Sequence, residues 1–104
     1  MSAININKNN YESVKNESRP VLIDFYADWC GACRYLSPAI EEIARENPQY
    51  LIAKVNVDDE PELANQFGVR SLPTLAVLKN GRLVNKSVGA RPKVQIMRLL
   101  ENQL

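Results

Sequence analysis

The run Val21-Leu-Ile-Asp-Phe-Tyr-Ala27 places the strongest constraint on the fold, because almost every residue in it is apolar. A nearly continuous apolar run of this length is typical of a strand that is covered on both faces, as in α/β proteins. With 104 residues, the chain can bury about two-thirds of its unfolded surface, which is enough for one core without disulfide staples. We therefore expect a single α/β domain over residues 1–104.

Strand and helix patterns alternate along the rest of the chain. The expected strands are Ala3–Ile6, Val21–Ala27, Leu51–Val57, Thr74–Leu78 and Leu83–Val88. The expected helices cover Tyr11–Asn16, a segment from the cysteines to just before Pro48, Pro61–Phe67 and a segment that Pro92 opens. Asn80-Gly81 is a strong signal for a tight hairpin. The order β-α-β-α-β-α-β-β-α predicts a five-stranded mixed sheet with helices on both faces, its antiparallel part supplied by the closing hairpin.

The apolar residues of the two longer helices recur at helical spacing. The second helix places Leu36, Ile40, Ile43 and Ala44 on one stripe. The last helix has Ile96, Leu99, Leu100 and Leu104 available for burial. Pro38 lies inside the second helix and is expected to kink it.

Charge and hydropathy favour an ordinary globular protein. Charged residues make up 24% of the chain, and the net charge is +1, so nothing suggests a nucleic-acid or membrane surface. No apolar run reaches the ~18–20 residues of a membrane helix. The N-terminal residues have no basic start followed by an apolar segment, so we expect a cytoplasmic monomer without a secretory signal.

Histidine is absent from the chain. This excludes Ser-His-Asp and Cys-His catalysis and any metal site that uses histidine. Proton transfer near neutral pH must then use a carboxylate, a lysine or a thiol with a shifted pKa.

Both cysteines lie in Trp29-Cys-Gly-Ala-Cys33, between the apolar strand and the next helix. Two intervening residues allow the sulfurs to form a small-loop disulfide. At a helix start, free N–H groups and the helix dipole favour a thiolate, and Arg34 adds positive charge nearby. Cys30 is therefore the expected nucleophile, and Cys33, one turn later, the resolving thiol.

Three other interpretations of the cysteine pair compete with redox chemistry. A zinc site needs four ligands, which two cysteines without histidine cannot supply in a monomer, so we expect no metal. A purely structural disulfide would cross-link almost no chain and would contribute little stability. Two neighbouring core cysteines are possible, but Gly31 and the helix start argue against this.

Four further residues are candidates for the site. Asp24 alternates with Leu22 and Tyr26 inside the strand, so burial would raise its pKa, unless it reaches solvent at a sheet edge. Lys54, in mid-strand, is either a charged neighbour of the site or an exposed lysine. Trp29 is either a docking residue or a half-buried core aromatic. Pro73 alone would be expected in the trans form.

Three segments resemble the thioredoxin family: Asp24–Cys33, Val69-Arg-Ser-Leu-Pro-Thr74 and Lys79-Asn-Gly81. The resemblance extends from about Ile4 to the C-terminus. It implies the thioredoxin fold and the reduction of disulfides in target proteins. It also implies recharging by thioredoxin reductase, a flavin enzyme that uses NADPH, so that no cofactor is bound to the chain itself.

The resemblance also implies roles for individual residues. Asp24 would be the acid–base partner of Cys33, Lys54 would tune it, and the Leu72–Pro73 bond would be cis and face the cysteines. A substrate segment would pair with the backbone of Leu72. The expected docking surface comprises Trp29, Gly31, Ala32, Leu72, Pro73, Gly89 and Ala90.

Three positions depart from the usual family pattern. Ala32 stands where proline is common, and its N–H is expected to donate to the Cys30 sulfur, stabilise the thiolate and make the couple more oxidising. Tyr26 replaces a common tryptophan, and Arg34 a common lysine.

Two other functions compete with the reduction of protein disulfides. A disulfide oxidase or isomerase uses the same fold, but the absence of a leader and of histidine between the cysteines argues against it. A non-enzymatic binding subunit would keep its function when Cys30 and Cys33 are changed to serine.

Overall fold

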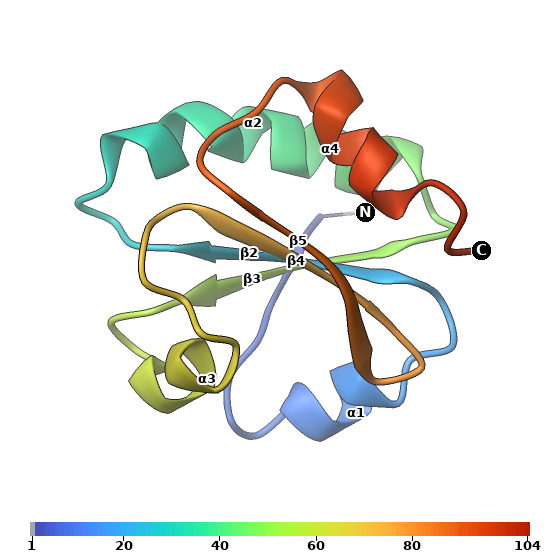
Figure 1. Cartoon of the computed structure of the whole chain (residues 1–104), viewed down its shortest axis with the longest axis horizontal. Helices are drawn as coiled ribbons and strands as arrows, with labels where there is room; N and C mark the ends of the chain where they lie inside the picture. Colours follow the sequence, from blue (N-terminus) through green and yellow to red (C-terminus); the bar gives the residue numbers. More distant parts are fainter. Residues whose placement is uncertain (1) are drawn as a thin grey trace.

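The computed structural model describes residues 2–104, and Met1 lies outside them. The strands are β1 (Ile4–Asn5), β2 (Val21–Tyr26), β3 (Leu51–Asn56), β4 (Thr74–Lys79) and β5 (Arg82–Val88). The helices are α1 (Tyr11–Lys15), α2 (Gly31–Glu46), α3 (Pro61–Gln66) and α4 (Lys93–Leu100). Figure 1 shows them in the expected order, β-α-β-α-β-α-β-β-α. Their ends differ from the expected ends by one or two residues, except that the last helix ends at Leu100 and does not reach Leu104.

The five strands form one mixed sheet in the order β1-β3-β2-β4-β5. Strands β1, β3 and β2 are parallel, whereas β4 runs antiparallel to both β2 and β5. The antiparallel part therefore begins at β2–β4 and not only at the closing hairpin. This arrangement places β2 between two partners, so its carboxyl end lies in the middle of the sheet.

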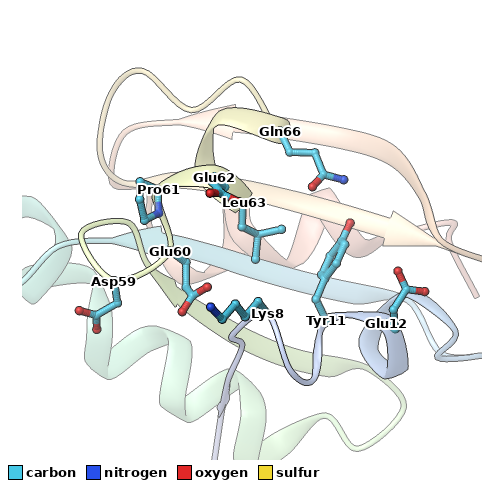
Figure 2. A pocket seen from close by; sticks show the side chains of 9 residues that line it. All are labelled: Lys8, Tyr11, Glu12, Asp59, Glu60, Pro61, Glu62, Leu63 and Gln66. Atoms are coloured by element: carbon cyan, nitrogen blue, oxygen red, sulfur yellow. The ribbon is translucent and has the colours of Figure 1, made fainter.

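Helices cover both faces of the sheet, as predicted, with α2 and α4 on one side and α1 and α3 on the other (Figure 1). Between α1 and α3 lies a depression of about 290 Å³ that contains neither cysteine. Tyr11 of α1 and Leu63 of α3 line it together with four carboxylates and Lys8 (Figure 2). The depression between α1 and α3 is therefore separate from the candidate site residues that the sequence indicates.

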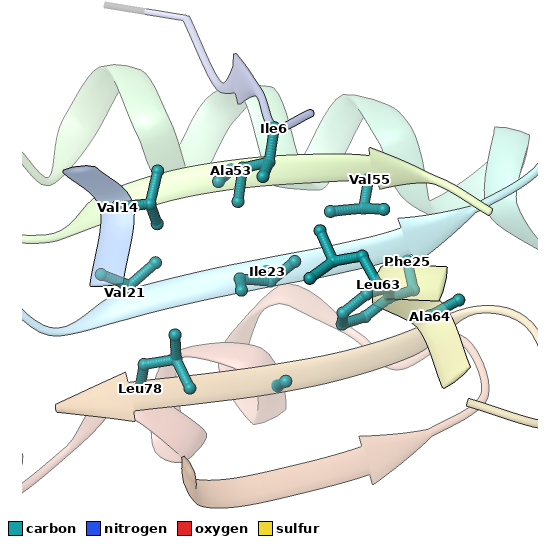
Figure 3. Close-up of a cluster of buried hydrophobic side chains, with 11 residues drawn as sticks. Ile6, Val14, Val21, Ile23, Phe25, Ala53, Val55, Leu63, Ala64 and Leu78 are labelled. Carbon is teal, nitrogen blue, oxygen red and sulfur yellow. The ribbon is translucent and has the colours of Figure 1, made fainter. Parts of the chain in front are cut away.

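The alternation of side chains along β2 divides the core into two clusters. Val21, Ile23 and Phe25 pack beneath α1 and α3 (Figure 3). Leu22 packs on the opposite face with apolar residues of α2 and α4. Because side chains in a strand point alternately to the two faces, Asp24 must share the α2 side with Leu22.

The hairpin between β4 and β5 has the backbone that its sequence predicts. Asn80 and Gly81 both have positive φ, 54° and 77°, as a two-residue hairpin turn requires. A Cβ atom on Gly81 would lie 3.1 Å from the carbonyl oxygen of Lys15, a tight contact that adds to the backbone strain of any other residue at this positive φ. One core prediction was wrong: Leu104 follows the end of α4 and is 74% exposed.

Candidate redox site

Cys30 and Cys33 form a disulfide at the beginning of α2. Cys30 is the N-cap residue, in an extended conformation, and Cys33 lies in the first turn, with 5.2 Å between the two Cα atoms. Both side chains are buried, although Cys30, with 7% exposed, is more accessible than Cys33, with 3%. The sulfur of Cys30 is therefore the more accessible to an incoming reactant.

The surroundings of the disulfide favour negative charge on Cys30. The first turn of α2 contains no acidic residue, and its free N–H groups carry the positive end of the helix dipole. Arg34 folds back over this end, with its Nη1 donating to the carbonyl oxygen of Asp28 at 2.7 Å. A Cys30 thiolate would thus face N–H dipoles and a nearby guanidinium.

In the disulfide form, the Cys30 sulfur accepts a hydrogen bond from Cys33 and not from Ala32, while the expected bond from Ala32 to a Cys30 thiolate stays a prediction. The backbone N–H of Cys33 donates to the Sγ atom of Cys30 at 3.2 Å, as expected of an N-cap side chain and the third residue of a helix. The side chain of Ala32 is exposed beside the cysteines.

Asp24 is buried with only 1% of its surface exposed. Its two carboxylate oxygens have no hydrogen-bond partner among residues 2–104. Burial raises the pKa of Asp24 to about 7; nearby Lys54 opposes this rise and Glu41 adds to it. The alternative of a carboxylate reaching solvent at a sheet edge is therefore wrong.

A depression of about 300 Å³ is lined by both Asp24 and the second cysteine. Its lining residues are Asp24, Tyr26, Ala27, Asp28, Cys33, Arg34, Ser37 and Lys54. Cys33 and the unpartnered carboxyl group of Asp24 therefore border the same small space.

Lys54 is half-buried beside Asp24, with which it is paired in register across β2 and β3. Its Nζ atom donates to Ser37 Oγ at 3.2 Å and lies 4.7 Å from the centre of the Tyr26 ring. The alternative of a fully exposed lysine is wrong. Ser37 was missed by the sequence analysis, although its position four residues after Cys33 places both on one face of α2.

The loop before β4 faces the disulfide with a cis peptide bond between Leu72 and Pro73, as the resemblance implies. The N–H of Gly89 donates to the Pro73 carbonyl at 2.8 Å and joins the two loops. Within residues 2–104, neither the N–H nor the C=O of Leu72 makes a backbone hydrogen bond. These groups are available to an extended peptide.

A groove of about 350 Å³ passes over the sulfur of Cys30. Its lining residues are Trp29, Cys30, Val57, Ala64, Val69, Arg70, Ser71 and Leu72. Trp29 is 68% exposed, so the half-buried core alternative is wrong, and its Nε1 donates to Asp58 Oδ2 at 2.9 Å. The sequence analysis gave no role to Val57 and Ala64, and it named the Val69–Ser71 segment only as part of the family resemblance. Of the seven residues expected at the docking surface, two line this groove, Trp29 and Leu72, and five do not: Gly31, Ala32, Pro73, Gly89 and Ala90.

Residues 2–104 contain neither a membrane-spanning helix nor a cluster of metal-binding side chains. None of the helices there is long and apolar enough to cross a lipid bilayer. No group of three or more histidine, cysteine or acidic side chains in that range is arranged to hold a metal ion.

Comparisons with known proteins all identify the same family. A model of the thioredoxin family matches residues 2–102. Thioredoxin 1 of Synechococcus elongatus is 44% identical over 94 residues, which cover 89% of this chain and 88% of that protein. The thioredoxin of Haemophilus influenzae is 43% identical and covers 97% and 96% of the two chains. The structure of a mutant thioredoxin from Halobacterium salinarum superposes with a TM-score of 0.91 at 33% identity, over 98% of this chain and 90% of that one.

Proposed function

The chain belongs to the thioredoxin family and is a protein disulfide oxidoreductase that works through Cys30 and Cys33, and from this premise we propose how its residues carry out the reaction. The observation that supports the proposal best is the depression that joins Cys33 to the unpartnered carboxyl group of Asp24. It provides a resolving thiol with a proton acceptor in a chain without histidine.

The first step is attack by the Cys30 thiolate on a disulfide of the substrate protein. A bond forms between the Cys30 sulfur and one substrate sulfur, the substrate disulfide breaks, and its other sulfur leaves as a thiolate that takes up a proton. The N–H groups at the start of α2 and the guanidinium of Arg34 favour the attacking thiolate.

The second step releases the reduced substrate. Cys33 gives its proton to Asp24, and its thiolate attacks the Cys30 sulfur, so that the Cys30–Cys33 disulfide forms and the second substrate sulfur leaves. Two electrons pass in total from the dithiol to the substrate. With a pKa of about 7, Asp24 is able both to accept and to release a proton near neutral pH.

Substrate binding is assigned to the groove over Cys30. We propose that an extended segment flanking the substrate disulfide pairs with the free backbone groups of Leu72 and contacts Trp29. Pro73, Gly31 and Ala32 would shape the wall close to the sulfur, and Gly89 and Ala90 would extend this surface.

The cycle closes when a partner reduces the Cys30–Cys33 disulfide. We propose that this partner is a thioredoxin reductase, so that NADPH is used indirectly and the chain itself binds no cofactor. A protein that donates electrons to disulfides needs a reducing compartment, which supports a cytoplasmic location. We expect it to act as a monomer, because the whole site lies on one chain.

The test is NADPH consumption with a thioredoxin reductase and insulin as the disulfide substrate. The unmodified protein should support turnover, and Cys30→Ser should abolish it. Cys33→Ser is the matched control, because it keeps the nucleophile and should accumulate a mixed disulfide. If the protein forms and breaks its disulfide with dithiothreitol but supports no turnover, a different electron donor or an oxidase function would replace this proposal.

A further inference from the structure

The ammonium group of Lys54 is held by α2 and β2 in a position close to, but not on, Asp24. Its Nζ donates to Ser37 Oγ at 3.2 Å and lies over the Tyr26 ring at 4.7 Å. Among residues 2–104, no ion pair within 4.0 Å joins Lys54 to Asp24, although the two residues are direct neighbours across β2 and β3. The hydroxyl of Ser37 is thus the hydrogen-bond acceptor that fixes this cation.

Ser37 lies close to both the Cys33 thiol and the Asp24 carboxyl group. It lies one helical turn after Cys33 and one turn before Glu41, so the three residues lie along one side of α2, where Ser37 and Glu41 are half-buried. Ser37, Cys33 and Asp24 line the same depression. The Ser37 hydroxyl and the Lys54 ammonium that it binds thus lie beside both reacting groups.

We propose that Ser37 is a positioning residue, whose hydroxyl keeps the Lys54 ammonium at the mouth of the depression, where it acts on Asp24 by charge while leaving both carboxylate oxygens free for proton exchange. The inference rests on the proposed acid–base role of Asp24 and adds to it a residue that acts through Lys54.

The physical basis is the freedom of the lysine side chain. A half-buried lysine has a flexible four-carbon stem and a strongly hydrated head, so it stays ordered only where polar contacts offset the loss of rotamers and water. Without the hydroxyl, the Tyr26 ring is the one direct contact of Nζ that the structure shows among residues 2–104, beside its longer-range attraction to Asp24. We expect the ammonium then to turn into the solvent, where water screens its effect on Asp24.

The other charged groups around Asp24 do not replace Lys54. Glu41 of α2 raises the pKa of Asp24, as burial does. Arg34 and Cys33 of α2, with Tyr26 and Asp28 on and after β2, line the depression, and the Arg34 guanidinium is bound to the Asp28 carbonyl. Lys54 is the cation that lowers the pKa of Asp24, so its displacement should be visible in that pKa.

The experiment follows the side-chain carboxyl carbon of Asp24 by NMR during a pH titration of the oxidised protein. In Ser37→Ala, the pKa of Asp24 should rise by about half a unit, the size expected when a unit charge moves from near the group into water. Ser37→Thr, which keeps the hydroxyl, should titrate like the unmodified protein. Alanine favours helix, so Ser37→Ala should keep the fold, and circular dichroism checks this.

A double-mutant cycle with Lys54→Met shows whether Ser37 acts through the lysine. Lys54→Met alone should raise the pKa of Asp24, and Ser37→Ala should add nothing in that background. An unchanged or lower pKa in Ser37→Ala would overturn the inference, as would a rise on Ser37→Ala that is equally large with and without the Lys54→Met substitution. Since the titration needs no substrate or reductase, its result stands apart from the outcome of the insulin assay.

Discussion

The buried carboxyl group of Asp24 should make the stability of the oxidised protein depend on pH. Its pKa is about 7 in the folded state, against an ordinary value of 3.8. The folded protein therefore binds this proton more tightly than the unfolded chain does. The stability that this proton contributes is fully present below pH 3.8 and is lost as the pH rises through 7. At higher pH, the titration of Asp24 no longer changes the free energy of unfolding.

The magnitude follows from the two pKa values. Integrating proton binding by both states from about pH 5 to about pH 8.5 gives a loss of about 2.5 kcal/mol in the free energy of unfolding. Solvent screening does not reduce this much, since the side chain is 1% exposed. In Asp24→Asn, the loss over the same interval should disappear.

The assay is guanidinium denaturation of both oxidised proteins at several pH values between these limits. Groups other than Asp24 titrate in both proteins, so the difference between the two free energies isolates Asp24. Glu17, whose pKa is lowered to about 2 by its hydrogen bonds with Arg19, titrates below this interval. A difference that is the same at both ends of the interval would refute the assignment of a raised pKa to Asp24.

Three further predictions concern the groove, the end of α3 and the Cys30–Cys33 redox couple. Trp29→Ala should lower kcat/KM for insulin several-fold and change the free energy of unfolding by less than about 0.5 kcal/mol, since the side chain is exposed; an unchanged kcat/KM would remove Trp29 from the docking surface. Lys86→Met should cost about 1 kcal/mol in chemical denaturation, because Lys86 Nζ binds the Phe67 and Gly68 carbonyls where α3 ends; equal stability would show that these contacts contribute nothing. Ala32→Pro should lower the reduction potential of the couple in a glutathione redox titration, because proline removes an N–H from the start of α2; an equal or higher potential would contradict this.

Much of the scaffold could be predicted because local patterns and burial agree along it. The alternation in β2 correctly places Asp24 on the opposite side from Val21, Ile23 and Phe25. Asn80 and Gly81 adopt the backbone that their turn type demands. The N-cap position of Cys30 likewise follows from a strand that must end before a helix begins.

Local sequence patterns could not predict the contacts between segments that are distant in the chain. The exposure of Trp29 depends on Asp58, which follows β3 and accepts from its indole nitrogen. The contact between Lys54 and Ser37 depends on how α2 crosses the sheet. The donor to the Cys30 sulfur depends on the detailed geometry of one helical turn, which selects Cys33 and not Ala32. Each of these requires the tertiary arrangement and not the pattern of one element.

The place of β2 in the sheet has a consequence for local opening of the molecule. Its backbone is paired on both sides, with β3 and β4, whereas β1 has two residues and β5 lies at the other edge. Amide hydrogens in such a central strand exchange with solvent only in large unfolding events, while sheet edges open at small cost. The Cys30–Cys33 turn follows directly from β2. When an edge strand, β1 or β5, frays, the turn therefore stays attached to the strand of the sheet whose amide hydrogens exchange most slowly.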